Sequence, residues 1–376
     1  MKNTKVFNNQ KLIRSKSLFR FVSGWALFLL TTLTIAKVPD TLGKINTDFQ
    51  AGTKVTVTSH SFNKGINGKV FSSVTVDDDN TKWFVTDVGI VSFDGKKWSK
   101  AKKNKKFPSG NLNDIEYTSS SDGKKLLIAS PQGAFVASLP LAAKSGVTTF
   151  NSKTTSILSD NVLSVAIGKG SLRWFGTDKG IFAFRDEKWL SNSYQRGYPE
   201  RLFRNSPITA MATSFYGDTL YAATEGAGVA RVYRNSVDAI SGASEYAIWG
   251  PIDMPSDKVY SICITPDGTQ WFGTNMGVAR HIGKRTLENW KVFNTSSGLI
   301  DNFVQAIAVD KTGKVWFGTK GGVSVFDGSS WISYTTKDGL TSNNILCITT
   351  DKNGVMWFGT DNGVISFNNG EFINYK

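Results

Sequence analysis

The chain has 376 residues and a formal net charge of +14, with 12% aromatic residues and 36 glycines. Proline is scarce and no low-complexity segment is present, which argues against a disordered protein. The positive charge could attract polyanions, but the chain has no recognisable nucleic-acid-binding motif, so nucleic acid is not an expected partner.

Residues 1–36 are typical of a secretory signal peptide. The first twenty positions contain six lysines and arginines and no acidic residue, and residues 21–36 form an uncharged, mostly apolar run that ends in Thr34, Ile35 and Ala36. An uncleaved N-terminal anchor is the alternative, although a membrane-spanning helix usually needs about 20 apolar residues. Either reading predicts an extracytoplasmic location, periplasmic or secreted, in a bacterial cell envelope. Residues 37–52 are predicted to be a tether.

A short motif that begins with a large apolar residue occurs seven times. Its clearest copies are Trp174–Ile181, Trp271–Val278, Trp316–Val323 and Trp357–Val364, and the seven lead positions are 83, 127, 174, 221, 271, 316 and 357. A repeat period in the forties without a helical pattern indicates a propeller of four-stranded blades. The predicted fold is therefore all-β, a seven-bladed β-propeller of four-stranded antiparallel blades.

One repeat shows how the strands are predicted. Residues 302–310 alternate apolar and small side chains, as expected for an innermost strand, and residues 310–313 form a hairpin turn. Residues 314–319, 323–326 and 331–334 are predicted to be the next three strands. The same register in every repeat places the propeller at residues 53–376, with blades at about 70–108, 109–158, 159–204, 205–255, 256–300, 301–341 and 342–376.

The alternating residues Thr53–Thr58 predict one strand, within residues 53–62, that the seven repeats do not need. Its register matches a fourth strand, but residues 371–375 already provide that strand for the last blade. One placement is the outer edge of the seventh blade, where it would cover an exposed sheet edge and latch the ring.

The two cysteines, Cys263 and Cys347, each precede an aspartate by four residues and are interpreted as equivalent positions in two repeats. Other repeats have small residues at the position assigned to them, which predicts a buried free thiol packed against a neighbouring blade. A disulfide across an intervening blade is not expected.

The motif Leu/Val-Trp-Phe-Gly-Thr-x-x-Gly-Val, followed by Phe-Asp-Gly-x-x-Trp and Gly-Leu-x-x-Asn, resembles the two-component regulator propeller repeat over about residues 65–376. This family forms the extracytoplasmic sensors of hybrid histidine kinases, whose propellers detect carbohydrate breakdown products. The resemblance therefore implies a sensing or ligand-binding propeller. Because the family's second propeller, β-sandwich, membrane helix and kinase are not found in the sequence, its signalling output is not implied.

Candidate binding residues are those that differ between repeats. The spacer before the fourth blade combines arginines with aromatic residues, which suits a carboxylated or sulfated sugar or a protein partner. The spacer before the second blade is a lysine cluster that would attract an anion without orienting it. The predicted ligand-binding residues are Tyr194, Arg196, Tyr198, Arg201, Arg204, Lys102, Lys103 and Lys105. A plain solvated loop is the alternative for both spacers.

Catalysis is not expected. The only histidines are His60 and His281, and the sequence has no nucleophile motif, metal-ligand cluster or phosphate-binding glycine loop, so no metal and no cofactor are predicted. The predicted function is non-catalytic binding, with an anionic glycan or an envelope protein as partner. A protein scaffold of the envelope and a propeller-type lyase or hydrolase are the alternatives. The chain is predicted to be monomeric and to reach a membrane only through an uncleaved N-terminal segment.

Overall fold

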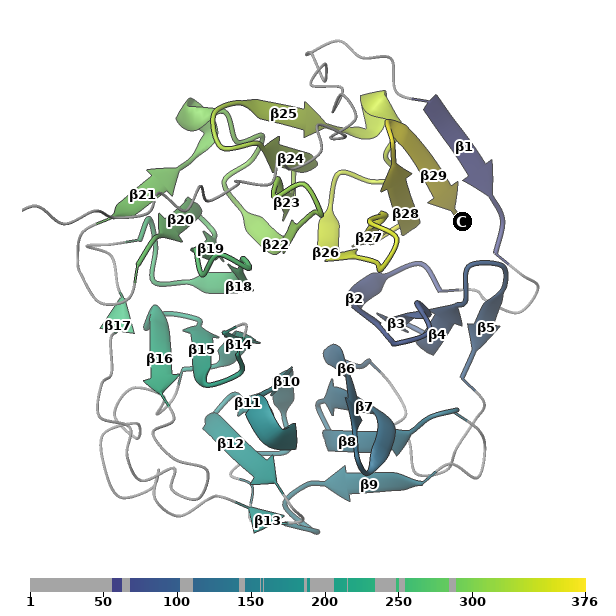
Figure 1. The fold of residues 1–376 in the computed structure, drawn as a ribbon, viewed down its shortest axis with the longest axis vertical. Coiled ribbons are helices and arrows are strands. Elements are labelled where there is room, and N and C mark those ends of the chain that lie inside the picture. Colours follow the sequence, from purple (N-terminus) through teal and green to yellow (C-terminus); the bar gives the residue numbers. More distant parts are fainter. Residues whose placement is uncertain are drawn as a thin grey trace, which may run out of the picture. The chain divides into compact units, whose positions relative to one another are not determined.

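The computed structural model describes residues 56–62, 68–101, 111–141, 146–155, 157, 159–185, 188–189, 206–214, 216–233, 248–249, 254–283 and 289–376. They belong to the compact unit Gln50–Lys376, in which seven β-sheets surround one axis (Figure 1). Six sheets contain four described strands and the seventh contains five. The predicted seven-bladed, all-β propeller is confirmed. The leader and the tether lie outside the described residues.

The first four blades follow the chain. Blade one contains β2 (Phe71–Val76), β3 (Lys82–Thr86), β4 (Gly89–Phe93) and β5 (Trp98–Lys100). Blade two contains β6 (Asp114–Ser120), β7 (Gly123–Ser130), β8 (Gly133–Ser138) and β9 (Val147–Phe150). Blade three contains β10 (Val162–Ile167), β11 (Arg173–Thr177), β12 (Gly180–Arg185) and β13 (Lys188–Trp189). Blade four contains β14 (Ile208–Thr213), β15 (Thr219–Thr224), β16 (Val229–Tyr233) and β17 (Ile248–Trp249).

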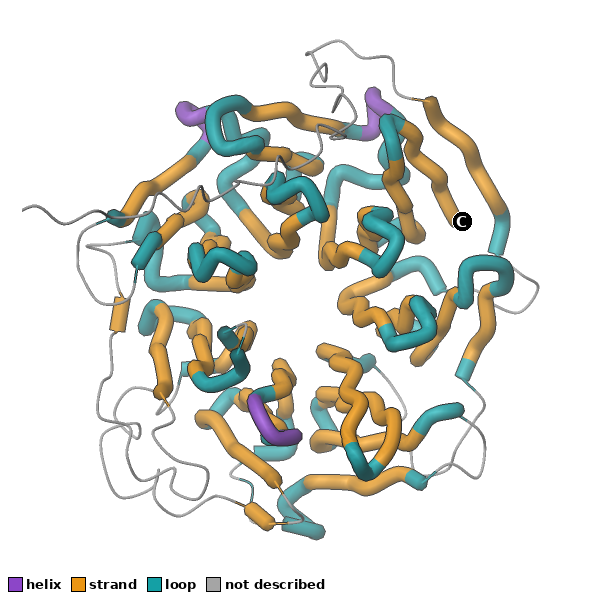
Figure 2. Tube along the Cα trace, in the orientation of Figure 1, coloured by secondary structure: helices purple, strands orange, loops and turns teal. Residues whose placement is uncertain are grey.

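The last three blades are the most regular. Blade five contains β18 (Val259–Ile264), β19 (Gln270–Thr274), β20 (Gly277–His281) and β21 (Trp290–Phe293). Blade six contains β22 (Val304–Val309), β23 (Val315–Thr319), β24 (Val323–Phe326) and β25 (Trp331–Tyr334). Blade seven contains β26 (Ile345–Thr350), β27 (Met356–Thr360), β28 (Gly363–Asn368) and β29 (Glu371–Tyr375), with β1 (Thr56–His60) outside them. Figure 2 shows how strands dominate, with short 3₁₀ turns at η1 (Lys169–Ser171), η3 (Thr295–Ser297) and η4 (Thr336–Asp338).

The strand order defines two faces of the ring. In each blade the first strand is innermost and the following strands continue outward in antiparallel order (Figure 1). Turns between the first and second and between the third and fourth strands therefore share one face, which we call the hairpin face. Turns between the second and third strands share the other face with the loops that lead to the next blade, and we call it the crossover face.

The glycine of the Trp-Phe-Gly-Thr strands is required where blades meet. In blade seven Gly359 lies opposite Cys347 on β26. A Cβ atom at Gly359 would collide with the Cys347 Sγ atom and with the carbonyl oxygen of Phe71 on the innermost strand of blade one. The Phe71 carbonyl also accepts a hydrogen bond from the Cys347 thiol at 3.4 Å. The absence of a side chain therefore lets blade one approach blade seven.

Gly359→Ala is expected to destabilise the ring by about 1 to 3 kcal/mol, because the added methyl group meets backbone that cannot rotate away. Urea unfolding followed by tryptophan fluorescence would measure the change. Gly146→Ala is the matched control, since its Cβ atom would lie 3.6 Å from the Ser138 Oγ atom, an ordinary contact. Equal stability of the two variants would contradict this account of blade packing.

The register corrects the interpretation of the two cysteines. Cys347 pairs with the glycine of its second strand, but Cys263 pairs with Trp271, two residues away from Gly273. Ser261 is the true equivalent of Cys347. The prediction was wrong because the aspartate of the blade five turn lies two residues later in its hairpin than the aspartate of blade seven. Cys347 is buried, Cys263 is only partly buried, and burial raises the pKa of each thiol to about 12.

The surplus N-terminal strand lies on the outer edge of blade seven. β1 pairs with β29 in parallel, and Thr58 Oγ1 donates to the Glu371 carboxylate at 2.8 Å. Beyond β1, the Phe62 amide donates to the Lys376 carbonyl at 2.8 Å. Figure 1 shows β1 beside β29 at the rim of the ring. The strand is added to a blade that is already complete, and it covers the edge of that blade.

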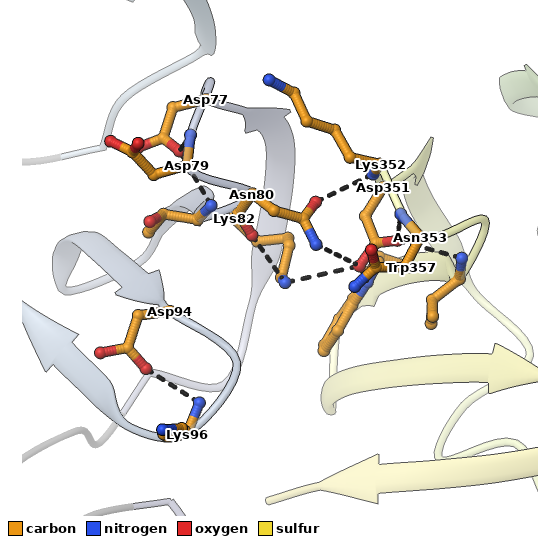
Figure 3. A network of polar contacts seen from close by, with 12 residues as sticks. Asp77, Asp79, Asn80, Lys82, Asp94, Lys96, Asp351, Lys352, Asn353 and Trp357 are labelled. Carbon is orange, nitrogen blue, oxygen red and sulfur yellow. Dashed lines mark hydrogen bonds and ion pairs between the residues drawn. The ribbon is translucent and has the colours of Figure 1, made fainter.

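A second contact between the first and last blades is a polar network on the hairpin face (Figure 3). The Lys82 ammonium of β3 lies 3.4 Å from the Asp351 carboxylate, and both side chains are 3% exposed. The ammonium also donates to the Asn80 carbonyl at 2.8 Å and lies 5.0 Å from the centre of the Trp357 ring. The Asn80 side chain in turn accepts from the Lys352 amide at 2.9 Å. Burial lowers the pKa of Lys82, and the Asp351 carboxylate opposes this shift.

Within the described part of the chain, no helix has the length and apolar character to cross a membrane.

Candidate functional site

All eight predicted binding residues lie outside the described residues. They are Tyr194, Arg196, Tyr198, Arg201, Arg204, Lys102, Lys103 and Lys105. In the sequence both spacers fall between the fourth strand of one blade and the first strand of the next. The described residues at the equivalent connections lie on the crossover face. The described residues of that face can be compared blade by blade.

The turn between the second and third strands starts with an acidic residue in four blades. These residues are Asp87, Asp178, Glu225 and Asp361. The Asp87 carboxylate accepts the backbone amides of Lys69 and Val70 at 3.0 and 3.4 Å, and the Asp361 carboxylate accepts from the Asn344 side chain at 3.0 Å. At least these two therefore hold the incoming loop of their own blade. Blade six has Lys320 at this position instead.

Lys320 belongs to an aromatic cluster between blades five and six. Phe303 immediately precedes β22, and its ring stacks on that of Tyr260, near the start of β18, with ring centres 4.8 Å apart and planes at 29°. The Lys320 ammonium lies 3.8 Å from the centre of the Phe303 ring. Both rings are partly buried and Lys320 is exposed. This set, which we call the mouth cluster, places two partly buried aromatic rings and one positive charge on the crossover face.

The surroundings of the mouth cluster are polar. Burial raises the pKa of the Tyr260 hydroxyl, and the carboxylate of Glu225 in blade four adds to the increase. The hydroxyl is therefore neutral at physiological pH and can donate a hydrogen bond. In blade six, the Gln305 side chain donates to Asn344 at 2.8 Å and to the Ile345 carbonyl at 3.0 Å, which ties blade six to blade seven. The cluster is thus supported by rigid inner strands.

The sequence signal for the mouth cluster lies at single positions within the repeats and not in the spacers. Phe303 stands where blades three and seven have Asn161 and Asn344, and Lys320 stands where four other blades have acids. Both differences are visible only when the repeats are aligned position by position. Tyr260 occupies a column that also varies, so its pairing with Phe303 required the structure.

The innermost strand of blade two carries two carboxyl groups, Asp114 and Glu116. Asp114 takes the position of Ser73 in blade one and Ser164 in blade three. Its carboxylate joins both neighbours, since it accepts from the Ser73 hydroxyl at 2.6 Å and from the Val165 amide at 3.0 Å. Asp114 therefore links three adjacent blades near the ring centre.

Glu116 has a different environment. Burial raises the pKa of Glu116 to about 8, and the nearby Asp114 carboxylate adds to the shift. Burial also raises the pKa of Asp114, against hydrogen bonds from Ser73 and from the backbone amides of Val165 and Ile115. Glu116 makes no hydrogen bond or ion pair within the part of the chain that the structure describes. Interacting carboxyl groups titrate as a pair, and the proximity of Asp114 favours the protonated form of Glu116.

The histidines do not form a site together. His60 is exposed on the outer strand β1, where its ring stacks on Tyr375. His281 is the last residue of β20 and is buried, with Nδ1 2.6 Å from the Gln270 side-chain oxygen. Among the described residues no group of three or more His, Cys, Asp or Glu side chains is arranged to hold a metal ion.

The fold and the regular crossover face define the chain as a seven-bladed β-propeller built from a tryptophan-led repeat. Residues 298–321 and 339–362 match the family model of the two component regulator propeller. These two segments therefore match the two-component regulator propeller repeat, which confirms the resemblance expected from the sequence. No curated protein matches the sequence at a significant level.

Solved structures share the fold. The extracellular domains of two proteins described as hybrid two component systems from B. thetaiotaomicron are 18% and 21% identical, with TM-scores of 0.62 and 0.63. They cover 82% and 81% of this chain, which spans only 39% of the length of each of them. A streptogramin B lyase structure is 16% identical, with a TM-score of 0.62, 82% coverage of this chain and 96% of its own. At these identities the likeness shows the fold.

Proposed function

We propose that the chain is a non-catalytic extracytoplasmic propeller that binds anionic carbohydrate on its crossover face. The mouth cluster is the observation that carries this proposal. Stacked Tyr260 and Phe303 offer an apolar surface to the C–H face of a sugar ring, and Lys320 offers a charge to its carboxylate or sulfate group. The rigid ring supports the surface, so little ordering is needed when a ligand binds.

Two further points support the proposal. Two repeats match the regulator propeller model, and the B. thetaiotaomicron structures with the same fold are extracellular domains. The signal-like leader in residues 1–36 agrees with that location. The arginine and lysine spacers remain predictions. Their arginines would add bidentate charges, and their lysines point charges, for an anionic ligand.

Lys320→Gln and Phe303→Ala are each expected to weaken the binding of uronate-containing oligosaccharides at least about tenfold, since the first removes the charge and the second removes the stacking surface. Isothermal titration calorimetry of the mature protein would measure the affinities, with neutral oligosaccharides of equal length as the ligand control. Lys337→Gln is the matched control variant, because Lys337 is exposed on η4, outside the mouth cluster.

Two outcomes would contradict the proposal. If acidic and neutral oligosaccharides both fail to bind the unmodified protein, the ligand class is wrong. If the oligosaccharide chain is shortened during incubation, as detected by chromatography, the protein is an enzyme and the lyase or hydrolase alternative holds. Unchanged binding by Lys320→Gln together with a loss in Arg196→Ala would instead move the site to the arginine spacer.

A further inference from the structure

A groove of about 510 Å³ lies between blades five and six on the hairpin face, opposite the mouth cluster. Its lining comes from the turn after β18, the end of β20, the turn after β22 and the turn after β24. Buried Trp271, Val315 and Phe326 contribute apolar surface, and Ile282, which is 43% exposed, lies at its outer part. The groove is thus separate from the site proposed for carbohydrate and is formed by other elements.

Arg280 is the residue that makes this groove unusual. It pairs with Trp271 across β19 and β20, and its guanidinium carbon lies 5.7 Å from the ring centres of both Trp271 and Phe293. Five other blades have Ser, Ala or Val at this strand position. These residues are Ser92, Val136, Ala183, Val325 and Ser366. Blade four has Arg231 at this position, so the repeat accepts an arginine here but does not require one.

The guanidinium of Arg280 is stacked on two rings and has no hydrogen bond to any residue that the structure describes. Its Nε atom is buried without a hydrogen-bond partner, and within the described residues Arg280 forms no ion pair. A ligand that accepts from the guanidinium would add a hydrogen bond that the described residues do not supply. The planar group is held by two aromatic rings, so its donors are already oriented.

The acidic residues around the groove are engaged in their own turns. Asp310 accepts from the Lys314 amide at 3.0 Å and from the Trp316 indole at 2.8 Å. Asp327 accepts from the Ser330 amide at 2.7 Å, and such backbone hydrogen bonds lower its pKa. These side chains leave Arg280 unpaired among the described residues. The two basic residues of the groove, Arg280 and Lys311, are outnumbered by three acidic ones, Asp267, Asp310 and Asp327. They favour a ligand with a single negative charge and disfavour a dianion.

We propose that this groove binds a small organic monocarboxylate with an apolar body. The carboxylate would accept hydrogen bonds from the Arg280 guanidinium, which matches carboxylate geometry with two parallel donors. The apolar body would lie against Val315, Phe326 and Ile282. The ligand needs no second charge, because the aspartates at the groove repel one.

Saturation-transfer NMR and calorimetry with benzoate test the proposal on the full-length chain. Benzoate should bind the unmodified protein, whereas methyl benzoate, which has the same apolar body without the charge, should not. Inorganic phosphate should bind at least about tenfold more weakly than benzoate. Arg280→Gln should lower the benzoate affinity at least about tenfold. Lys291→Gln should leave it unchanged, because the Lys291 ammonium lies 5.0 Å from the centre of the Phe293 ring but is not part of the groove.

A second variant separates loss of the site from loss of the fold. Ile282→Glu places a negative charge at an exposed position in the groove, so the protein should fold normally and lose benzoate binding. Equal benzoate affinity in Arg280→Gln or in Ile282→Glu, or equal binding of methyl benzoate, would overturn the proposal. Because Lys320→Gln changes only the opposite face, it should affect acidic oligosaccharides and leave benzoate binding intact.

Discussion

Lys82→Ala is expected to lower the free energy of unfolding by about 3 to 5 kcal/mol, one of the largest effects of any single substitution in the ring. Its ammonium is buried against the Asp351 carboxylate at the junction of the first and last blades (Figure 3). Removing the cation leaves that carboxylate buried, with hydrogen bonds from the Trp357 indole at 3.1 Å and from backbone amides but without a counter-charge. The substitution also removes the ammonium that lies over the rings of Phe93 and Trp357.

Chemical denaturation of Lys82→Ala and of the double variant Lys82→Met with Asp351→Asn would separate these effects. Blade seven has Met356 at the position of Lys82, which shows that the repeat accepts an apolar side chain there. The double variant removes both charges and should therefore be more stable than Lys82→Ala. A loss below about 1 kcal/mol in Lys82→Ala would show that water replaces the ammonium and that the ion pair does not hold the ring together.

Glu116→Gln is expected to stabilise the protein at pH 8 to 9 by about 2 to 4 kcal/mol. The pKa of Glu116 is raised from 4.5 to about 8 in the folded state, so the folded chain binds this proton more tightly than the unfolded chain does. Stability from this group is therefore complete below the unfolded pKa and is lost as the pH rises towards 8. The amide of glutamine cannot ionise and avoids that loss. The full shift corresponds to about 5 kcal/mol, and the partial exposure of Glu116 reduces it.

Unfolding curves at unit steps from pH 5 to pH 9 would measure this dependence. The unmodified protein should lose stability across the interval, and Glu116→Gln should lose much less. Glu225→Gln is the control, since Glu225 is exposed in a surface turn. A parallel pH dependence in the unmodified protein and Glu116→Gln would mean that another group titrates, with Asp114 the first alternative because burial also raises its pKa.

The sequence predicted the ring because its signal is repeated and local. Four of the five tryptophan-led strands have a glycine where the next blade approaches, at Gly176, Gly273, Gly318 and Gly359, and blade one has Val85 there. The eroded second repeat lacks that marker, since Ala129 stands opposite Asp114. The inner strand of that blade is therefore hard to predict from the sequence, and so is its carboxyl pair, Asp114 and Glu116.

The candidate sites could not be predicted in the same way, because they depend on contacts between blades. Phe303 and Tyr260 are separated by 43 residues in sequence, and no local pattern indicates that their rings stack. Arg280 lies in an ordinary strand position, and only the register shows that five other blades have a small or aliphatic residue there while blade four has Arg231. Sequence reasoning favoured long spacers rich in charge, whereas the structure shows single substitutions within the repeat.

The position of β1 suggests how a circularly permuted propeller could be made. The Lys376 amide donates a hydrogen bond to the His60 carbonyl at 3.0 Å. The Phe62 amide donates one to the Lys376 carbonyl at 2.8 Å. The backbone thus passes beside its own last residue, separated by one pair of hydrogen bonds. A peptide linker of a few residues from Lys376 to Phe62 would make the polypeptide a continuous loop through all seven sheets. New termini could then be opened in any surface turn, with β1 left out of the permuted chain.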